Sequence, residues 1–312
     1  MKRTAAPYLE LHRSGGLRRK SEEALALLEN CSLCPRKCGV NRLRVEEGFC
    51  RTGRYAKVAS HSPHFGEESP LVGRGGSGTI FFSSCNLLCS FCQNYDISHL
   101  NIGTVTRPDD LSDMMVQLER SGCGNINFVT PSHVVPQILE ALPRAIDKGL
   151  SVPLVYNTGS YDSIGTIRLM EGVIDIYMPD FKFWESLSCS SFMGAADYPE
   201  VAKEALKEMH RQTGDLMLDE EGMAVRGLLV RHLVMPGHVT GTGDIMNFIS
   251  REISRDTYVN LMDQYRPCYR ALTDPLIARR ITRTEYEEAL ISAKQAGIHR
   301  LDGHNDIFKT PQ

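Results

Sequence analysis

Three cysteines with a short, regular spacing are the residues of this sequence best suited to chemistry. Cys85, Cys89 and Cys92 form a Cys-x3-Cys-x2-Cys pattern. Three thiolates on one loop can bind three irons of a [4Fe-4S] cube, whereas most clusters of this kind use four. The missing ligand would leave one iron free to bind another molecule. A zinc site, a disulfide pair and buried core thiols are the alternative interpretations.

A second set of cysteines lies nearer the N-terminus, in the pattern Cys31-x2-Cys34-x3-Cys38-x11-Cys50. Few large apolar residues surround it, so a bound metal could supply the folding free energy that a core would otherwise provide. Cys-x2-Cys is a common half of a zinc site, and Cys-Pro runs also occur in ferredoxins. A second iron-sulfur cluster, a zinc ion, and thiols that bind no metal or form a disulfide all stay open.

Composition narrows the class of protein. The chain has 312 residues, of which 42% are hydrophobic, enough for one large core. A net charge of −3 gives no basic excess for nucleic-acid binding, and the absence of a run of 18 apolar residues predicts no membrane span. The first 20 residues read as a solvated basic start that includes Lys2 and Arg3, not as a signal peptide. Ten cysteines without an export signal predict a reducing, cytoplasmic and low-oxygen setting.

Six apolar runs alternate with helical patterns along most of the chain. Nearly continuous apolar runs are typical of parallel strands that are buried on both faces. The predicted strands span residues 79–84, 125–130, 152–157, 173–178, 228–235 and 258–262. The predicted helices between them span residues 110–120, 135–148, 164–172, 200–212 and 244–251. The pattern predicts an α/β fold with a partial, TIM-like (β/α)6 barrel, and a doubly wound sheet is the alternative.

Regions outside this repeat have their own signals. A helix is predicted over residues 21–28 with Ser21 as its N-cap. Thr282 and Glu285 form a capping box that predicts a helix to about residue 295. We therefore divide the chain into a Cys-rich N-terminal region (1–72), a core barrel (73–270) and a C-terminal helical tail (271–312). Cys123, Cys189 and Cys268 are isolated and are predicted to be buried thiols.

Polar residues follow each predicted strand at once. The cysteine loop, residues 130–133, 157–162, 179–182, 236–238 and 263–265 occupy these places. Loops after the strands of an α/β barrel converge on one rim, which predicts a single active site there; ordinary turn chemistry is the alternative. His133 is interpreted as a structural hydrogen-bonding residue or a catalytic one. His61, His64, Glu67 and Glu68 are predicted to lie in a solvated loop.

Several runs carry a family resemblance that covers nearly the whole chain. They are residues 78–83, 92–95, 155–157, 175–182 and 230–237, together with the aromatic Phe91 before the third cysteine. The sequence resembles the radical S-adenosylmethionine (SAM) superfamily, in particular the pyruvate formate-lyase activating enzymes and their uncharacterised PflX-like branch. The resemblance implies that Cys85, Cys89 and Cys92 ligate a [4Fe-4S] cluster. It also implies that SAM fills the open corner of the cluster.

The same resemblance implies roles for further residues. Phe91 and Gln93 would flank the adenosyl group, and Asp180 and Lys182 would lie near SAM. Arg231 would hold the methionine carboxylate, for which a guanidinium is well suited. The family's Gly-Gly-Glu-Pro run, which contacts the SAM amino group, is replaced here by the run that contains Thr130 and Ser132. Either hydroxyl could take over that contact.

The implied activity is that of an oxidoreductase that cleaves SAM and uses the 5′-deoxyadenosyl radical to abstract hydrogen. It could serve as an activase that installs a glycyl radical on a partner enzyme, with flavodoxin or ferredoxin as electron donor. One alternative is a radical SAM maturase or small-molecule enzyme. Another is an iron-sulfur electron carrier or sensor without radical chemistry, for which four thiolates per cluster are expected.

Overall fold

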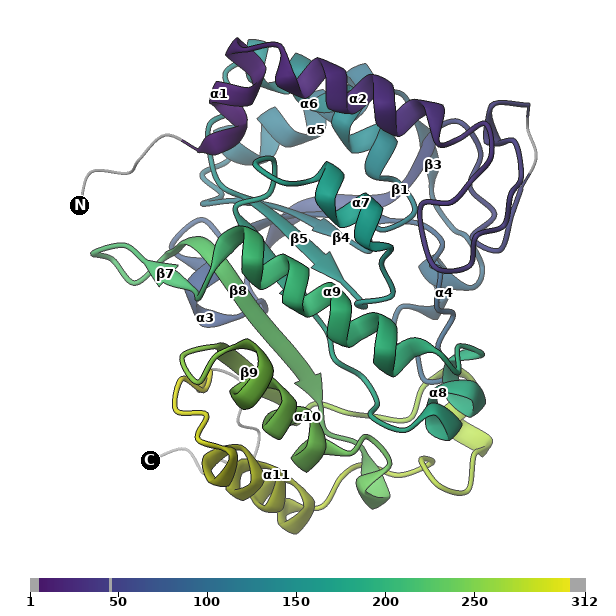
Figure 1. Ribbon diagram of the computed structural model, residues 1–312, viewed down its shortest axis with the longest axis vertical. Coiled ribbons are helices and arrows are strands. Elements are labelled where there is room, and N and C mark those ends of the chain that lie inside the picture. Colours follow the sequence, from purple (N-terminus) through teal and green to yellow (C-terminus); the bar gives the residue numbers. More distant parts are fainter. Residues whose placement is uncertain (1–5, 45–46, 304–312) are drawn as a thin grey trace.

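The computed structural model describes residues 6–44 and 47–303 and is built around a nine-stranded sheet (Figure 1). The strand order is β3-β1-β2-β4-β5-β6-β8-β7, and β9 pairs with β8. Six strands pair in parallel and in chain order: β2 (Ser77–Phe82), β4 (Ile126–Val129), β5 (Leu154–Thr158), β6 (Ile176–Pro179), β8 (Ala224–Leu233) and β9 (Tyr258–Met262). The predicted α/β architecture with a parallel sheet is therefore confirmed.

Helices connect these strands because parallel neighbours need a crossover between them. The connecting helices are α5 (Pro108–Arg120), α6 (Val135–Asp147), α7 (Ile164–Leu169), α9 (Tyr198–Thr213) and α10 (Thr242–Phe248). Strands β5 and β6 are buried along their whole length, which explains their nearly continuous apolar sequences. The predicted units thus occur in the predicted order, with shifted ends.

The first edge of the sheet is antiparallel and was not predicted. Strand β1 (Ala56–His64) pairs with β2, and β3 (Thr104–Thr106) pairs with β1. Most of β1 is exposed, so its sequence lacks the apolar run that marks the other strands. Within the described residues the sheet is open, and the finer assignment to a (β/α)6 barrel stays a prediction.

The N-terminal segment forms two helices from residue 7 onward, and its basic residues Arg13, Arg18 and Arg19 are exposed, as expected of a solvated basic start. Helices α1 (Pro7–Arg13) and α2 (Gly16–Ala26) lie over α6 (Figure 1). The Tyr8 hydroxyl is buried and donates to the Val152 carbonyl at 2.8 Å. Ser21 lies inside α2 and is buried, so it is not an N-cap. Lys2 and Arg3 lie outside the described residues.

The C-terminal helix α11 (Arg283–Ala296) confirms the predicted capping box. Glu285 donates its backbone N–H to the Thr282 hydroxyl at 3.2 Å, and the Glu285 carboxylate accepts the Thr282 N–H at 2.7 Å. Helix α11 packs on α10, and one apolar core extends from Tyr8 to Ile298. The division of the chain into three regions stays a prediction.

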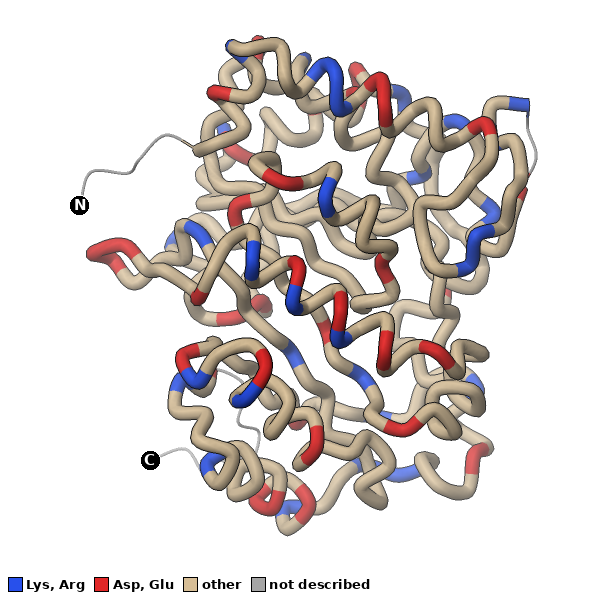
Figure 2. Tube along the Cα trace, in the orientation of Figure 1, with Lys and Arg blue, Asp and Glu red and all other residues tan. Residues whose placement is uncertain are grey.

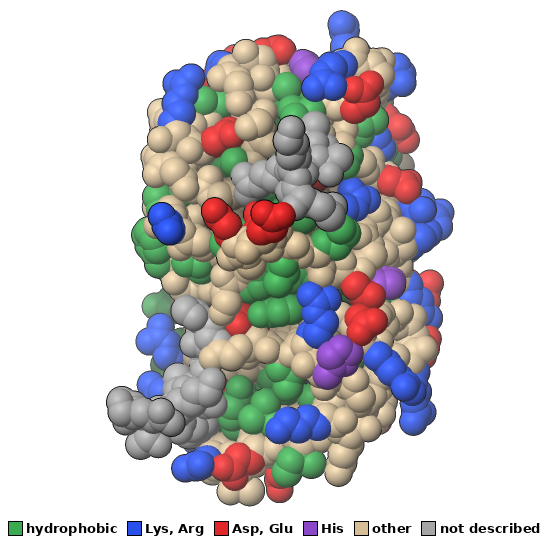
Figure 3. All heavy atoms as spheres, turned by 90° about the vertical axis from the view of Figure 1, so that its left-hand side faces the viewer, with side chains coloured by type: hydrophobic (Ala, Val, Ile, Leu, Met, Phe, Trp, Pro, Cys, Tyr) green, Lys and Arg blue, Asp and Glu red, His purple; other side chains and the backbone are tan. Residues whose placement is uncertain are grey.

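The remaining elements are short. They are α3 (Ser69–Val72), α4 (Tyr95–Ser98), α8 (Ser186–Met193), β7 (Met217–Leu218), the 3-10 turns Arg42–Arg44, Pro236–His238 and Tyr269–Thr273, and a π-helical turn at Ile249–Ile253. Charges of both signs alternate along the visible helices (Figure 2), as in the α9 ion pair between Lys203 and Glu200. The face of the molecule that contains β7, on the left in Figure 1, carries apolar patches between charged groups (Figure 3). Within the described residues, no helix combines the length and apolar character that crossing a membrane requires.

Candidate active site

A cavity of about 160 Å³ lies at the carboxyl ends of the parallel strands. All three cysteines of the Cys-x3-Cys-x2-Cys loop line it. The opposite part of its wall contains polar side chains from the ends of β4, β5, β6 and β8, namely Thr130, Asn157, Thr158, Asp180, Lys182 and Arg231. The parallel sheet therefore brings together groups that are far apart in the sequence, as expected for strand ends that share one rim.

The cysteine loop follows β2 and folds back on itself through left-handed residues, with φ of 73° at Ser84 and 54° at Leu88. The Cys85 sulfur accepts the Leu87 N–H at 3.3 Å, and the Cys92 sulfur accepts the Ser98 hydroxyl at 3.2 Å. Burial raises the pKa of the Cys89 thiol, and the nearby positive charge of Lys182 opposes this rise. These contacts would stabilise thiolates, the form in which cysteine binds iron.

The arrangement of these cysteines fits three corners of an iron-sulfur cluster. Cys85, Cys89 and Cys92 all line one cavity. In a [4Fe-4S] cube each thiolate binds a different iron, so the sulfurs need not meet at one point. The ten cysteines form no disulfide, which removes that alternative for both sets.

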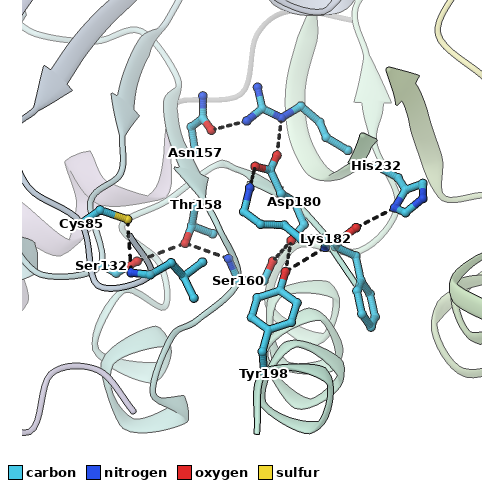
Figure 4. A network of polar contacts seen from close by, with 12 residues as sticks. Cys85, Ser132, Asn157, Thr158, Ser160, Asp180, Lys182, Tyr198 and His232 are labelled. Carbon is cyan, nitrogen blue, oxygen red and sulfur yellow. Dashed lines mark hydrogen bonds and ion pairs between the residues drawn. The ribbon is translucent and has the colours of Figure 1, made fainter. Parts of the chain in front are cut away.

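Asp180, Lys182 and Arg231 form a compact group of charges that lines the same cavity as the cysteine loop. Asp180 and Lys182 are labelled in Figure 4. Asp180 binds Lys182 Nζ at 2.6 Å and Arg231 Nε at 2.7 Å. Burial raises the pKa of Asp180, but the charges of Arg231 and Lys182 outweigh it, so the pKa is lowered and the carboxylate is ionised. The second arm of Arg231 donates to Asn157 Oδ1 at 2.8 Å.

Glu67 and Glu68 lie behind Arg231, so their predicted place in a solvated loop is wrong. They are 6% and 3% exposed, and their carboxylates approach Arg231 Nη1 to 3.8 and 3.7 Å. Burial and the neighbouring Glu68 raise the pKa of Glu67 to about 8. Their sequence carries no local sign of burial, because the partner Arg231 comes from a distant strand. His61 and His64 are exposed as predicted, but they lie on strand β1 and not in a loop.

A second layer of hydrogen bonds fixes the turns that carry these groups. Asp162 is buried and accepts the Thr158 hydroxyl at 2.6 Å and the Tyr156 hydroxyl at 2.8 Å. Ser160 and Tyr198 both donate to the Asp180 carbonyl, at 2.6 and 2.9 Å (Figure 4). Such bonds hold a binding group in one geometry.

Three residues singled out from the sequence lie elsewhere. Among the described residues, those that line the cavity do not include Phe91, Gln93 or His133. Phe91 packs edge-on against Phe183 in the core, and Gln93 is exposed. His133 is buried, binds the Ser83 carbonyl through Nε2 at 2.9 Å, and has its pKa lowered to about 4 by burial. It faces a different pocket, which is lined by the other cysteine set.

Comparisons with known proteins place the chain among relatives of unassigned function. No family model matches the sequence. An uncharacterised protein of Methanocaldococcus jannaschii, MJ0674, is 34% identical over 286 residues, which cover 89% of this chain and 78% of that protein. The radical SAM methyltransferase TsrM from Kitasatospora setae, solved with cobalamin and a [4Fe-4S] cluster, gives a TM-score of 0.43 at 16% identity. That match covers 60% of this chain and 36% of TsrM, a likeness too weak to assign a function.

Proposed function

We propose that this chain, which belongs to the same family as the Methanocaldococcus jannaschii protein MJ0674, is a radical SAM enzyme. One observation carries the proposal: three cysteines and the charged group of Asp180, Lys182 and Arg231 line the same cavity. The cysteines suit a cluster with one open iron. The charged group suits the amino-acid end of a ligand bound next to that iron.

The hard chemistry would come from the cofactors. A reduced [4Fe-4S] cluster at Cys85, Cys89 and Cys92 would supply one electron to the sulfonium of SAM, which splits into methionine and a 5′-deoxyadenosyl radical that abstracts hydrogen. The protein has to bind SAM in one orientation and keep water away from the reacting atoms. The apolar Phe82 and Leu87, which lie in the cavity wall, support the exclusion of water.

The charges of Asp180, Lys182 and Arg231 are complementary to the ammonium and carboxylate groups in the methionine part of SAM. Asp180 could pair with the ammonium group of the methionine part, while Lys182 and Arg231 could pair with its carboxylate. Asp180 pairs with both Lys182 and Arg231, so ligand binding would exchange internal ion pairs for new ones. Thr130 also lines the cavity and could bind the amino group in place of the acidic residue of the activating enzymes.

A more specific proposal concerns the molecule from which hydrogen would be abstracted. The resemblance to pyruvate formate-lyase activating enzymes, including their PflX-like branch, favours an oxidoreductase that installs a glycyl radical on a partner enzyme. A maturase or a small-molecule enzyme would use the same site with another hydrogen donor. Flavodoxin or ferredoxin is the proposed electron donor, and a low-oxygen cytoplasm is the proposed setting.

The test is SAM cleavage. Protein reconstituted anaerobically with iron and sulfide, then reduced with dithionite, should bind SAM and release 5′-deoxyadenosine. Cys123→Ala, which alters a buried cysteine outside the cavity, should behave like the unaltered protein. If protein with a full cluster releases no 5′-deoxyadenosine, the radical chemistry is ruled out and the iron-sulfur carrier becomes the better account.

A further inference from the structure

The four N-terminal cysteines meet in the folded chain although the proposed reaction does not use them. Cys31, Cys34, Cys38 and Cys50 line one pocket together with Arg42 and His133. Three of the four are buried, and Cys38 is exposed. The pocket therefore reaches from the protein interior to the surface.

Hydrogen bonds reach three of the sulfurs around this pocket. Cys38 accepts the Phe49 N–H at 3.3 Å. Burial raises the pKa of the Cys34 and Cys50 thiols, and hydrogen bonds from the backbone of Arg36 and Thr52 oppose this rise. Such bonds are of the kind that stabilise the sulfurs of iron-sulfur sites.

Arg42 supplies a buried positive charge. It is 1% exposed, and its guanidinium bonds are to the carbonyls of Gly53 and His133 and, at 3.9 Å, to the Cys31 sulfur. Within the described residues no carboxylate pairs with it. A buried cation is costly without an anion nearby, and a metal-thiolate centre would provide one.

The gap between these side chains is small. It measures about 10 Å³, roughly the room that one water molecule needs. The choice of an iron-sulfur cluster over zinc therefore rests on the contact of this pocket with the cysteine loop of the active site.

This pocket is in direct contact with the loop of the proposed active site. Arg36 Nε donates to the Asn86 carbonyl at 2.9 Å, and the Asn86 side chain hydrogen-bonds the Cys34 thiol. Asn86 directly follows Cys85 and lines the active-site cavity. One residue thus touches a cysteine of each set.

We propose that Cys31, Cys34, Cys38 and Cys50 hold a second iron-sulfur cluster that relays electrons to the cluster at Cys85, Cys89 and Cys92. A reduced one-electron carrier of the flavodoxin or ferredoxin class docks near the exposed Cys38 and loses one electron. The N-terminal cluster takes up that electron and passes it on past Asn86, so the carrier is oxidised and the active-site cluster is reduced. No bond forms or breaks in this transfer. The metal site stands by itself, whereas the relay rests on the proposed function.

The first experiment leaves the N-terminal cysteines intact. The triple variant Cys85→Ala, Cys89→Ala, Cys92→Ala is reconstituted anaerobically, and its iron, sulfide and zinc contents are measured. One iron-sulfur cluster per chain, reduced by the protein carrier in an electron paramagnetic resonance experiment, is the expected result. Zinc, no metal, or a cluster that the carrier does not reduce would each overturn the proposal. Because this variant cannot cleave SAM, its outcome is independent of the proposed function.

The second experiment compares two reductants. The double variant Cys34→Ala, Cys50→Ala leaves two thiolates and should lose the N-terminal cluster. It should keep 5′-deoxyadenosine release with dithionite, a small molecule that needs no relay. Release driven by the protein carrier should be lost in it, and Cys123→Ala should keep both activities. Unchanged carrier-driven release without the N-terminal cluster would overturn the relay. If the double variant does not fold, the triple variant still decides whether the N-terminal cysteines hold a cluster that the carrier reduces.

Discussion

The two cysteine sets of this protein differ in what surrounds them. The set at Cys85, Cys89 and Cys92 opens on a cavity of about 160 Å³ that also contains Asp180, Lys182 and Arg231. The set at Cys31, Cys34, Cys38 and Cys50 encloses about 10 Å³. Three thiolates beside a large charged cavity leave room for a ligand on the metal centre, whereas four around a small gap leave none. The comparison suggests that reactivity is set by the missing ligand and the space beside it, not by the presence of thiols.

The sharpest way to break this comparison is to remove single cysteines from each set. Cys85→Ala, Cys89→Ala and Cys92→Ala should each abolish 5′-deoxyadenosine release with dithionite, because a cluster held by two thiolates is not retained. Cys34→Ala should retain release under the same conditions. Chromatography of the product measures both. Equal losses in the two sets would mean that the sets do not have separate roles.

For the free energy of unfolding, we expect the N-terminal cysteine set to matter more than the active-site set. Cys34→Ala should lower the free energy of unfolding by on the order of several kcal/mol, because metal binding there contributes directly to folding. The control Cys123→Ala removes a buried thiol from the core and should cost roughly 1 kcal/mol. Anaerobic urea denaturation provides the measurement. A Cys34→Ala effect no larger than that of the control would count against metal-dependent folding.

We expect SAM binding in the cavity beside the active-site cysteines to depend on Arg231. Arg231→Lys should weaken SAM binding by about 1–3 kcal/mol, the scale of a hydrogen bond to a charged group, since an ammonium cannot reproduce the two-pronged contact. Arg226→Lys, on the same strand but outside the cavity, is the matched control. Equilibrium binding of SAM to the reconstituted protein tests this. Unchanged affinity with an intact cluster would remove Arg231 from the binding site.

A further effect should be a pH dependence of the free energy of unfolding. Glu67 has its pKa raised from 4.5 to about 8, so the folded protein holds a proton that the unfolded chain has released between these values. Rising pH across this window therefore favours unfolding. Glu67→Gln should reduce the decline in unfolding free energy between pH 4.5 and 8, as measured by denaturation at several pH values.

Part of the decline should persist in that variant. Asp175, far from Arg231 in the fold, has its pKa raised by burial to about 7 and contributes in the same direction. Asp175→Asn should remove this second part of the decline in unfolding free energy. A pH profile that is identical for the unaltered protein and Glu67→Gln would show that Glu67 is ionised in the folded state.

The sequence by itself determined the features that depend on local patterns. Apolar runs predicted the six parallel strands in their order because strands buried on both faces leave little room for polar residues. The capping box at Thr282 and Glu285 predicted the start of α11 because its hydrogen bonds span only four residues. The spacing of Cys85, Cys89 and Cys92 predicted that three thiols share one site, because the three residues are close together in the sequence, and all three line one cavity.

Only the tertiary structure decided which distant groups meet. The partners of Arg231 are Asn157 on β5, Asp180 after β6, and the adjacent Glu67 and Glu68 before α3. Burial of the two glutamates, and the contact of Asn86 with both cysteine sets, carry no local sequence signal because each arises from long-range packing. The same holds for β1, whose exposed residues form a strand only because β2 offers an edge to pair with. The sequence thus indicated which groups could do chemistry. The fold decided which other groups surround them, and these surroundings determine their role.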